Sequence, residues 1–77
     1  MSVKIILFGQ LKDLAGTSSI TLNEVNDLDS LKKKLLSDYP SLASSIYRIA
    51  VDRNFIEGNV ALSDNNEIAL LPPYSGG

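Results

Sequence analysis

The chain has 77 residues, of which 44% are hydrophobic and 21% are charged, and its net charge is −2 at pH 7. This composition is typical of one small globular domain, and it provides no electrostatic basis for binding nucleic acid. Cysteine and histidine are both absent, which excludes thiolate nucleophiles, Ser-His triads, disulfides and the common zinc sites.

The first predicted element is a β-strand over residues 3–9, where the letters VKIILFG contain an unbroken apolar run. Apolar side chains on both faces are typical of a central strand. The same opening has one lysine and no small-residue cleavage site, and no segment of the chain reaches membrane-spanning length, so we expect a cytoplasmic protein. Alternation places Val3, Ile5 and Leu7 on one face of the strand and Lys4, Ile6 and Phe8 on the other.

A short helical turn or loop is expected over residues 10–18, closed by Gly16, and a second strand over residues 19–25. In that strand Ile20, Leu22 and Glu24 alternate onto one side. The close spacing of the two strands predicts an antiparallel pair at the start of the domain.

The one long helix is predicted within residues 26–40, NDLDSLKKKLLSDYP, where the apolar period becomes helical. Asp27 is placed as its N-cap, and the helix has to stop before Pro40. The run Lys32-Lys33-Lys34 is interpreted as a solvated helix face. The apolar stripe is wide enough to pack on a sheet, and it consists of Leu28, Leu31, Leu35 and Tyr39.

A loop or partial helical turn is expected next, over residues 41–47, with Leu42 and Ile46 directed inward. A strand is then predicted within residues 47–56, ending near Asp52 in a polar turn.

The last part of the chain is expected to return to the core through Val60 and Leu62 and to end in a strand over residues 67–73. The turn before that strand contains Asn65 and Asn66, which tolerate positive φ better than any residue except glycine.

This element order predicts an α+β domain over residues 1–73, followed by an extended diglycine tail over residues 74–77. A right-handed crossover would place the last strand beside the first in the sheet centre, as in the ubiquitin-like β-grasp. We therefore expect a mixed sheet of four to five strands with one main helix across one face.

One helix cannot cover both faces of such a sheet, so the second face should carry an exposed apolar patch. Its predicted members are Ile6 and Phe8 of the first strand and Ala69 and Leu71 of the last. Such a patch is a candidate docking surface, rimmed by Lys4, Arg48 and Arg53; partial burial under residues 10–15 is the alternative.

The ending LLPPYSGG combines two prolines, which leave the sheet in an extended direction, with two glycines. Gly76 and Gly77 lack side chains and can enter a channel too narrow for any other residue. The reactive group would be the Gly77 α-carboxylate, a poor electrophile until another enzyme converts it into an acyl-adenylate. A frayed end without a role is the alternative.

Paired carboxylates provide no second candidate. Asp64 with Glu67, and Asp27 with Asp29, lie in turns or at a helix start, where capping explains them without catalysis. No metal site is predicted.

The run LSDNNEIALLPPYSGG resembles the C-terminal signature of the small subunit of molybdopterin synthase, a family with the ubiquitin-like β-grasp fold. VKIILFGQLKDLAG and DLDSLKKKLLSDYP are similar to the family's opening strand and its helix. The chain departs from the family at Asn65-Asn66, where a glycine is usual. It also departs at Asp52-Arg53-Asn54, where an Asn-Gly-Glu-like turn is usual, and this puts only the local loop geometry in doubt.

The resemblance implies a non-catalytic sulfur carrier whose Gly77 is held as an adenylate and then converted into a thiocarboxylate. Pro73, Tyr74, Ser75 and Gly76 would form the tail that enters the large subunit, where the sulfur is donated to cyclic pyranopterin monophosphate. The implied partners are that large subunit, which supplies the catalytic residues, an adenylating enzyme that uses ATP, and a sulfurtransferase. No cofactor would be bound permanently, and two carriers on a large-subunit dimer would form a heterotetramer.

Three other functions remain open from the residues alone. A carrier for thiamine thiazole synthesis would use the same tail chemistry with a different partner, although the Pro-Pro-x-Ser-Gly-Gly ending argues against it. A ubiquitin-like modifier would join Gly77 to target lysines. An interaction domain would function without Gly76 and Gly77.

Overall fold

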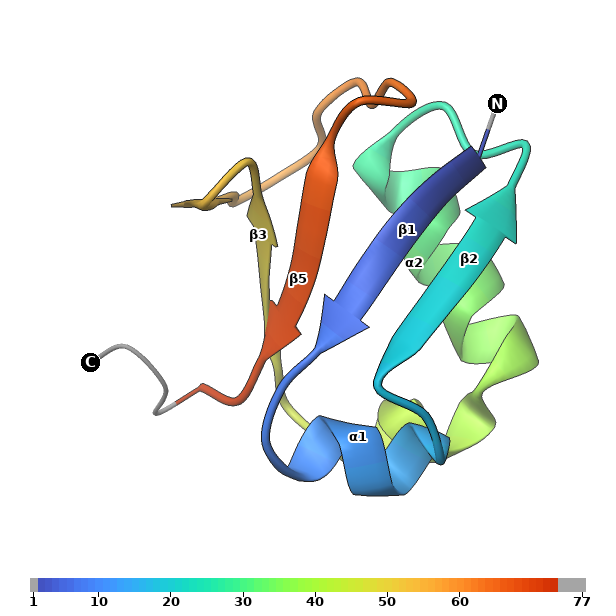
Figure 1. Cartoon of the computed structure of the whole chain (residues 1–77), viewed down its shortest axis with the longest axis vertical. Helices are drawn as coiled ribbons and strands as arrows, with labels where there is room; N and C mark the ends of the chain where they lie inside the picture. Colours follow the sequence, from blue (N-terminus) through green and yellow to red (C-terminus); the bar gives the residue numbers. More distant parts are fainter. Residues whose placement is uncertain (1, 74–77) are drawn as a thin grey trace.

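The computed structural model describes residues 2–73, which form a five-stranded mixed sheet with one long helix against one face (Figure 1). The predicted tail, residues 74–77, lies outside the described residues. In chain order the elements are β1 (Ser2–Leu7), α1 (Gln10–Ala15), β2 (Ser19–Asn23), α2 (Leu28–Asp38), the 3-10 helix η1 (Pro40–Ser44), β3 (Arg48–Val51), β4 (Asn54–Phe55) and β5 (Glu67–Leu71).

The strand order is β2-β1-β5-β3-β4, with the last long strand beside the first in the middle of the sheet. β1 runs parallel to β5 and antiparallel to β2, while β3 is antiparallel to both β5 and β4. The predicted α+β class, the central pair and the antiparallel opening strands are all confirmed. The long crossover between β2 and the later strands contains α2, which packs across one face as expected (Figure 1).

The core lies between α2 and the sheet. The predicted inward set of β1 is fully buried, and so are Leu28, Leu31 and Leu35 of α2, because strand alternation and the helical period point both sets at the same layer. Leu11 of α1 and Leu42 of η1 are also fully buried and close one end of this layer. The central members are Val3, Ile5, Leu7, Leu28, Leu31, Leu35, Ile68 and Leu70.

Helix α2 begins as the sequence predicts. The Asp27 carboxylate accepts a hydrogen bond from the Ser30 backbone N–H at 2.9 Å and another from the Asn59 side-chain amide at 3.1 Å. Asn59 in turn accepts from the Asp29 N–H at 2.9 Å, so the loop before β5 is tied to the helix start. Hydrogen bonds from the Ser30 side chain and backbone, and then from Asn59, lower the pKa of Asp27 below its ordinary value.

Because the folded pKa of Asp27 is lowered, its contribution to stability should be complete above about pH 4 and should be lost as the pH falls through the folded pKa. We expect Asp27→Ala to lower the denaturation midpoint at neutral pH and to reduce the loss of stability on acidification. Asp27→Asn keeps a capping oxygen and serves as the control. Urea titrations of the three proteins at neutral and acidic pH measure both effects. Identical acid sensitivity in all three would contradict this assignment.

Two expected inward side chains are not in the core. Ile46 is 75% exposed, because η1 ends at Ser44 and the chain is extended at Ser45, so the helical phase that would turn Ile46 inward is lost. Glu24 lies beyond the end of β2 with a φ of 61°, and this left-handed residue shifts the alternation so that Val25 enters the core instead.

The turn chemistry also differs from the prediction. The hairpin between β3 and β4 has a two-residue loop, Asp52 and Arg53, with φ values of 51° and 69°, the pattern of a type I′ turn. Asn54 is therefore already in β4, a strand too short to be predicted. Asn65 and Asn66 do not have positive φ; instead, the Asn66 carboxamide oxygen accepts from the Ser63 N–H at 2.6 Å.

Asp52 connects this hairpin to the turn before β5. Its carboxylate accepts from the Asn66 side-chain amide and from the Glu67 N–H, both at 2.8 Å. Both loops are thus held by side-chain hydrogen bonds. Within residues 2–73, no helix has the length and apolarity needed to cross a bilayer.

Candidate functional site

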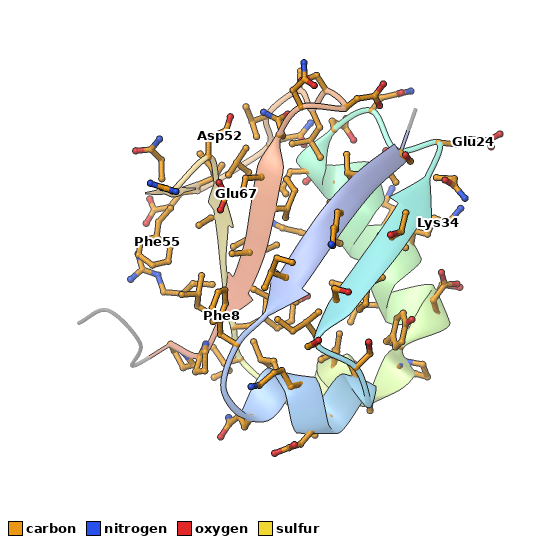
Figure 2. All side chains as sticks on the ribbon, in the orientation of Figure 1. Phe8, Glu24, Lys34, Asp52, Phe55 and Glu67 are labelled. Atoms are coloured by element: carbon orange, nitrogen blue, oxygen red, sulfur yellow. The ribbon has the colours of Figure 1, made fainter. Side chains whose placement is uncertain are left out.

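The face of the sheet opposite α2 carries a row of apolar side chains across four strands. Strand register places Ile6 beside Ala69, Ala69 beside Ala50, and Ala50 beside Phe55. Because directly paired residues project from the same face, these four form a continuous row. Ala50 is 7% exposed, whereas Phe55, at the sheet edge, is 41% exposed (Figure 2).

A second apolar pair lies at the end of the sheet from which the tail departs. Leu71 is the last residue of β5, and Phe8 directly follows β1, donating its backbone N–H to the Leu70 carbonyl at 3.0 Å. Phe8 is 44% exposed (Figure 2). We call this surface the open-face patch; it consists of Ile6, Phe8, Ala50, Phe55, Ala69 and Leu71.

The structure places all four residues predicted for this face on it and adds Ala50 and Phe55. The alternative, partial burial of this face under residues 10–15, finds no support in α1, which sends Leu11 into the core, packs against η1 at the end of the molecule and leaves Phe8 exposed. The two additional residues follow from the hairpin, whose two-residue turn sets Phe55 opposite Ala50. In the sequence, the pair Asp52-Arg53 between two short stretches of β-forming residues is the feature that indicates this hairpin.

Charged side chains surround the patch as predicted. Lys4 pairs in register with Glu67, and the Arg53 Nε lies 3.8 Å from the Glu67 Oε2, an exposed ion pair that contributes little to stability. The Arg48 guanidinium carbon lies 3.7 Å above the centre of the Phe55 ring. Both signs of charge therefore occur at the rim, while the centre is uncharged.

The base of the tail is anchored in the fold. Pro72 is buried and Pro73 is exposed. Gly9, in the turn between β1 and α1, has a φ of 59°, and a Cβ atom there would lie 2.8 Å from the Pro72 Cγ. Only glycine allows this approach, so the turn holds the proline ring directly after β5. The sequence identified Pro72 as a stiffener but gave no sign of its contact with Gly9.

Four of the predicted tail residues, Tyr74, Ser75, Gly76 and Gly77, lie outside the described residues. The structure places only Pro73, on the surface immediately after the anchored Pro72. The tail prediction therefore stays a prediction, whereas the position of its base is observed.

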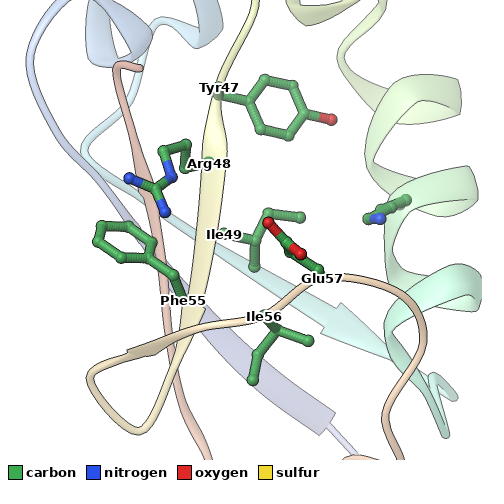
Figure 3. A pocket seen from close by; sticks show the side chains of 7 residues that line it. Tyr47, Arg48, Ile49, Phe55, Ile56 and Glu57 are labelled. Atoms are coloured by element: carbon green, nitrogen blue, oxygen red, sulfur yellow. The ribbon is translucent and has the colours of Figure 1, made fainter. Parts of the chain in front are cut away.

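A shallow groove of about 410 Å³ runs along the outer edge of β3, between the β3–β4 hairpin and α2 (Figure 3). Burial raises the pKa of the Tyr47 phenol above its ordinary value. The lining residues are Lys32, Tyr47, Arg48, Ile49, Phe55, Ile56 and Glu57.

Three of the four carboxylates considered as pairs in the sequence have structural partners. Asp27 caps α2, the Asp64 carboxylate accepts from the Ser2 N–H at 3.1 Å, and Glu67 pairs with Arg53. Between residues 2 and 73 no three metal-ligating side chains come together. The site with functional geometry is therefore the open-face patch together with the tail base beside it.

Comparisons with known proteins agree with this geometry. A sequence profile of the ThiS family matches residues 5–77. The molybdopterin synthase sulfur carrier subunit of Dictyostelium discoideum is 33% identical over 96% of this chain and 94% of its own length.

Two solved structures extend the likeness to the fold. The small archaeal modifier protein 1 of Methanosarcina acetivorans is 29% identical, with a TM-score of 0.81 over 99% of this chain and 96% of that one. A chain from the complex of subunits 1 and 2 of the Helicobacter pylori molybdopterin-converting factor is also 29% identical. Its TM-score is 0.75, and the match covers the whole of both chains. Because the family profile covers all but the first four residues and the fold agrees over the whole chain, this protein belongs to the ThiS family of ubiquitin-like β-grasp proteins.

Proposed function

We propose that this protein is the sulfur-carrier small subunit of a molybdopterin synthase, and that Gly77 carries the sulfur. The observation that supports this most strongly is the 33% identity to a sulfur carrier subunit of that enzyme over 96% of this chain, together with a family profile that extends to Gly77. The absence of cysteine and histidine fits a carrier that uses its own terminal carboxyl group rather than a side chain.

The proposed chemistry proceeds in two steps on the Gly77 carboxyl group. The carboxylate, ionised at neutral pH, attacks the α-phosphorus of ATP on an adenylating enzyme, and pyrophosphate leaves. Sulfur at the oxidation level of sulfide, delivered by a sulfurtransferase, then attacks the acyl carbon and displaces AMP. The product is a thiocarboxylate, a softer nucleophile than the carboxylate it replaces. Its sulfur attacks cyclic pyranopterin monophosphate and displaces an oxygen substituent, and water then cleaves the resulting thioester, which leaves the sulfur on the pterin and restores the Gly77 carboxylate.

The proposed delivery step uses the open-face patch as the docking surface for the large subunit. Its centre is apolar and its rim is charged, as in protein interfaces generally, and Leu71 of the patch directly precedes the anchored Pro72, from which the proposed tail begins. The likeness to a chain from the complex of the Helicobacter pylori molybdopterin-converting factor supports a large-subunit partner. The catalytic residues would belong to that partner, in a cytoplasmic heterotetramer.

A modifier function is the second candidate, supported by the 29% identity to a small archaeal modifier protein. It shares the adenylation step and differs in the acceptor, which would be a lysine amine of another protein. A carrier for thiamine thiazole synthesis would differ only in the enzyme that receives the sulfur.

Genetic complementation separates these candidates. We expect the chain to restore molybdoenzyme activity in a strain that lacks the molybdopterin synthase small subunit. We expect no growth without thiamine in a strain that lacks the thiazole sulfur carrier. Chymotryptic cleavage of total protein after Tyr74 should yield no Ser-Gly-Gly remnants on lysine that depend on this chain. Rescue of only the thiamine strain, or dependent remnants without rescue of molybdoenzyme activity, would contradict the proposal.

Docking through the open-face patch predicts that Ile6→Asp abolishes binding to the large subunit while leaving the fold intact. Ile6 is half-buried at the β1 end of the row, so a carboxylate there would be desolvated in the complex without a partner. Calorimetry should give a dissociation constant that is higher than that of the parent chain by roughly a hundredfold or more. The matched control is Thr21→Asp, because Thr21 is an exposed residue of β2 that lies on the same face of the sheet but outside the patch. Equal affinities of the two variants would show that the patch is not the docking surface.

A further inference from the structure

Arg48 lies at the junction of the open-face patch, the sheet edge and the tail base. It is the first residue of β3 and pairs in register with Leu71, the last residue of β5 before the two prolines. Its guanidinium carbon lies 3.7 Å from the centre of the Phe55 ring, so the cation is stacked on the aromatic face (Figure 3).

The guanidinium is oriented but has no anionic partner among the described residues. The ion pair found between residues 2 and 73 joins Arg53 to Glu67, and Glu57, which lines the same groove, is not within ion-pair distance of Arg48. Arginine carries five N–H donors in a planar fork, and stacking on Phe55 occupies only the face of that plane. Arg48 is exposed, so the donor edge of the fork remains accessible to another molecule.

This arrangement reduces the entropy that an arginine normally loses on forming an ion pair. A guanidinium free in solvent must be fixed before it can hold a carboxylate with both ends of the fork, whereas Arg48 is already stacked. Arginine and aromatic side chains are also the residues most enriched at the energetic centres of interfaces. Phe55 belongs to the patch, so the cation is continuous with the proposed docking surface.

We propose that Arg48 is a specificity-determining residue of the docking surface and that it receives an aspartate or glutamate carboxylate from the large subunit. The occupant is a protein surface with an apolar centre and one acidic side chain opposite the base of the tail. This inference rests on the proposed function, since it presupposes that a large subunit docks on the open-face patch. The ion pair would fix the rotation of the carrier about the patch, so that the chain leaving Pro73 points at the partner's channel.

Calorimetry with the purified large subunit from the same organism tests the proposal. We expect Arg48→Ala to weaken the dissociation constant roughly tenfold or more, and Arg48→Glu to weaken it further through repulsion between like charges. Arg48→Lys should fall between the parent chain and Arg48→Ala, because an ammonium keeps the charge but loses the stacked fork. Lys33→Ala removes one positive charge from α2, on the other side of the sheet, and should leave affinity unchanged.

Two further arms identify the group that Arg48 meets. The difference between the parent chain and Arg48→Ala should shrink at high salt, as expected for an ion pair. The same difference should persist in chains that end at Ser75, since the proposed carboxylate belongs to the partner. If the effect disappears in the shortened chains, Arg48 binds the tail carboxylate and the proposal is wrong.

The outcomes separate this proposal from the function on which it rests. If the parent chain binds the large subunit tightly and the Arg48→Ala variant binds with equal affinity, the role of Arg48 is overturned. The carrier function is then unaffected. A parent chain that shows no binding at all would overturn the docking step itself. Unchanged circular dichroism and denaturation midpoints of the variants exclude misfolding as the cause of any loss.

Discussion

A chain extended by one alanine beyond Gly77 is expected to support no molybdopterin formation, while unfolding at the same urea concentration as the parent. The extension moves the carboxyl group by one residue and places a side chain where the proposed channels require none. The terminal glycine belongs to a segment that follows the exposed Pro73, so the change should not reach the core. A reconstituted reaction with the large subunit, adenylating enzyme and sulfur source measures the product directly.

The matched control carries the same alanine at the other end, before Met1, and should retain full activity. Deletion of Gly77 should reproduce the loss, because the new terminus is one residue short of the reacting position. The expected loss is complete, down to the background of a reaction without carrier, since no side chain of this protein can substitute for the terminal carboxyl group. Product formed by the extended chain at the parent's rate would disprove the role of Gly77.

The second large effect is expected from Gly9→Ala, which should destabilise the domain by about 2–4 kcal/mol. The molecules of this variant that remain folded should also transfer sulfur less well than the parent chain. Two costs combine at this position. A residue with a side chain is strained at a φ of 59°, and its Cβ would lie 2.8 Å from the Pro72 Cγ, closer than non-bonded carbon atoms approach. Relief of the contact requires Pro72 to move, and Pro72 is the buried residue from which the tail begins.

Gly16→Ala separates the two costs. Gly16 also has a left-handed conformation, with a φ of 77° at the C-cap of α1, but no atom lies within 4 Å of its Cβ position. We therefore expect a loss of only about 1–2 kcal/mol, from backbone strain alone, and normal sulfur transfer. Urea denaturation and the reconstituted assay measure both variants. If both lose equal stability and both transfer sulfur normally, the contact between Gly9 and Pro72 does not position the tail.

The elements with strong local patterns were predictable from sequence. The alternation of Val3, Ile5 and Leu7 and the helical spacing of Leu28, Leu31 and Leu35 each fix which side chains face the core, and the structure buries all six. The continuous apolar run of β5 also agrees with its central position between β1 and β3. These signals depend on neighbours a few residues apart, which the sequence displays directly.

Features that depend on contacts between distant segments were not predictable in the same way. The contact of Gly9 with Pro72 joins opposite ends of the chain, and the stacking of Arg48 on Phe55 requires the exact register of a four-residue strand with a two-residue one. Ile46 was wrongly placed in the core because apolarity alone does not reveal where a 3-10 helix ends. Hydrogen bonds accepted by the Asp52 carboxylate hold the turn before β5, where left-handed asparagines were expected.

The central claim is that Gly77 carries the sulfur, and the mass of the chain recovered from cells tests it most directly. The chain should be produced in cells that make molybdopterin but lack the large subunit, so that the charged carrier accumulates. We predict a species heavier by the exchange of one oxygen for one sulfur, with fragmentation locating the change at Gly77. If every recovered chain carries an ordinary carboxylate while the adenylating enzyme and sulfurtransferase are active, the claim is contradicted.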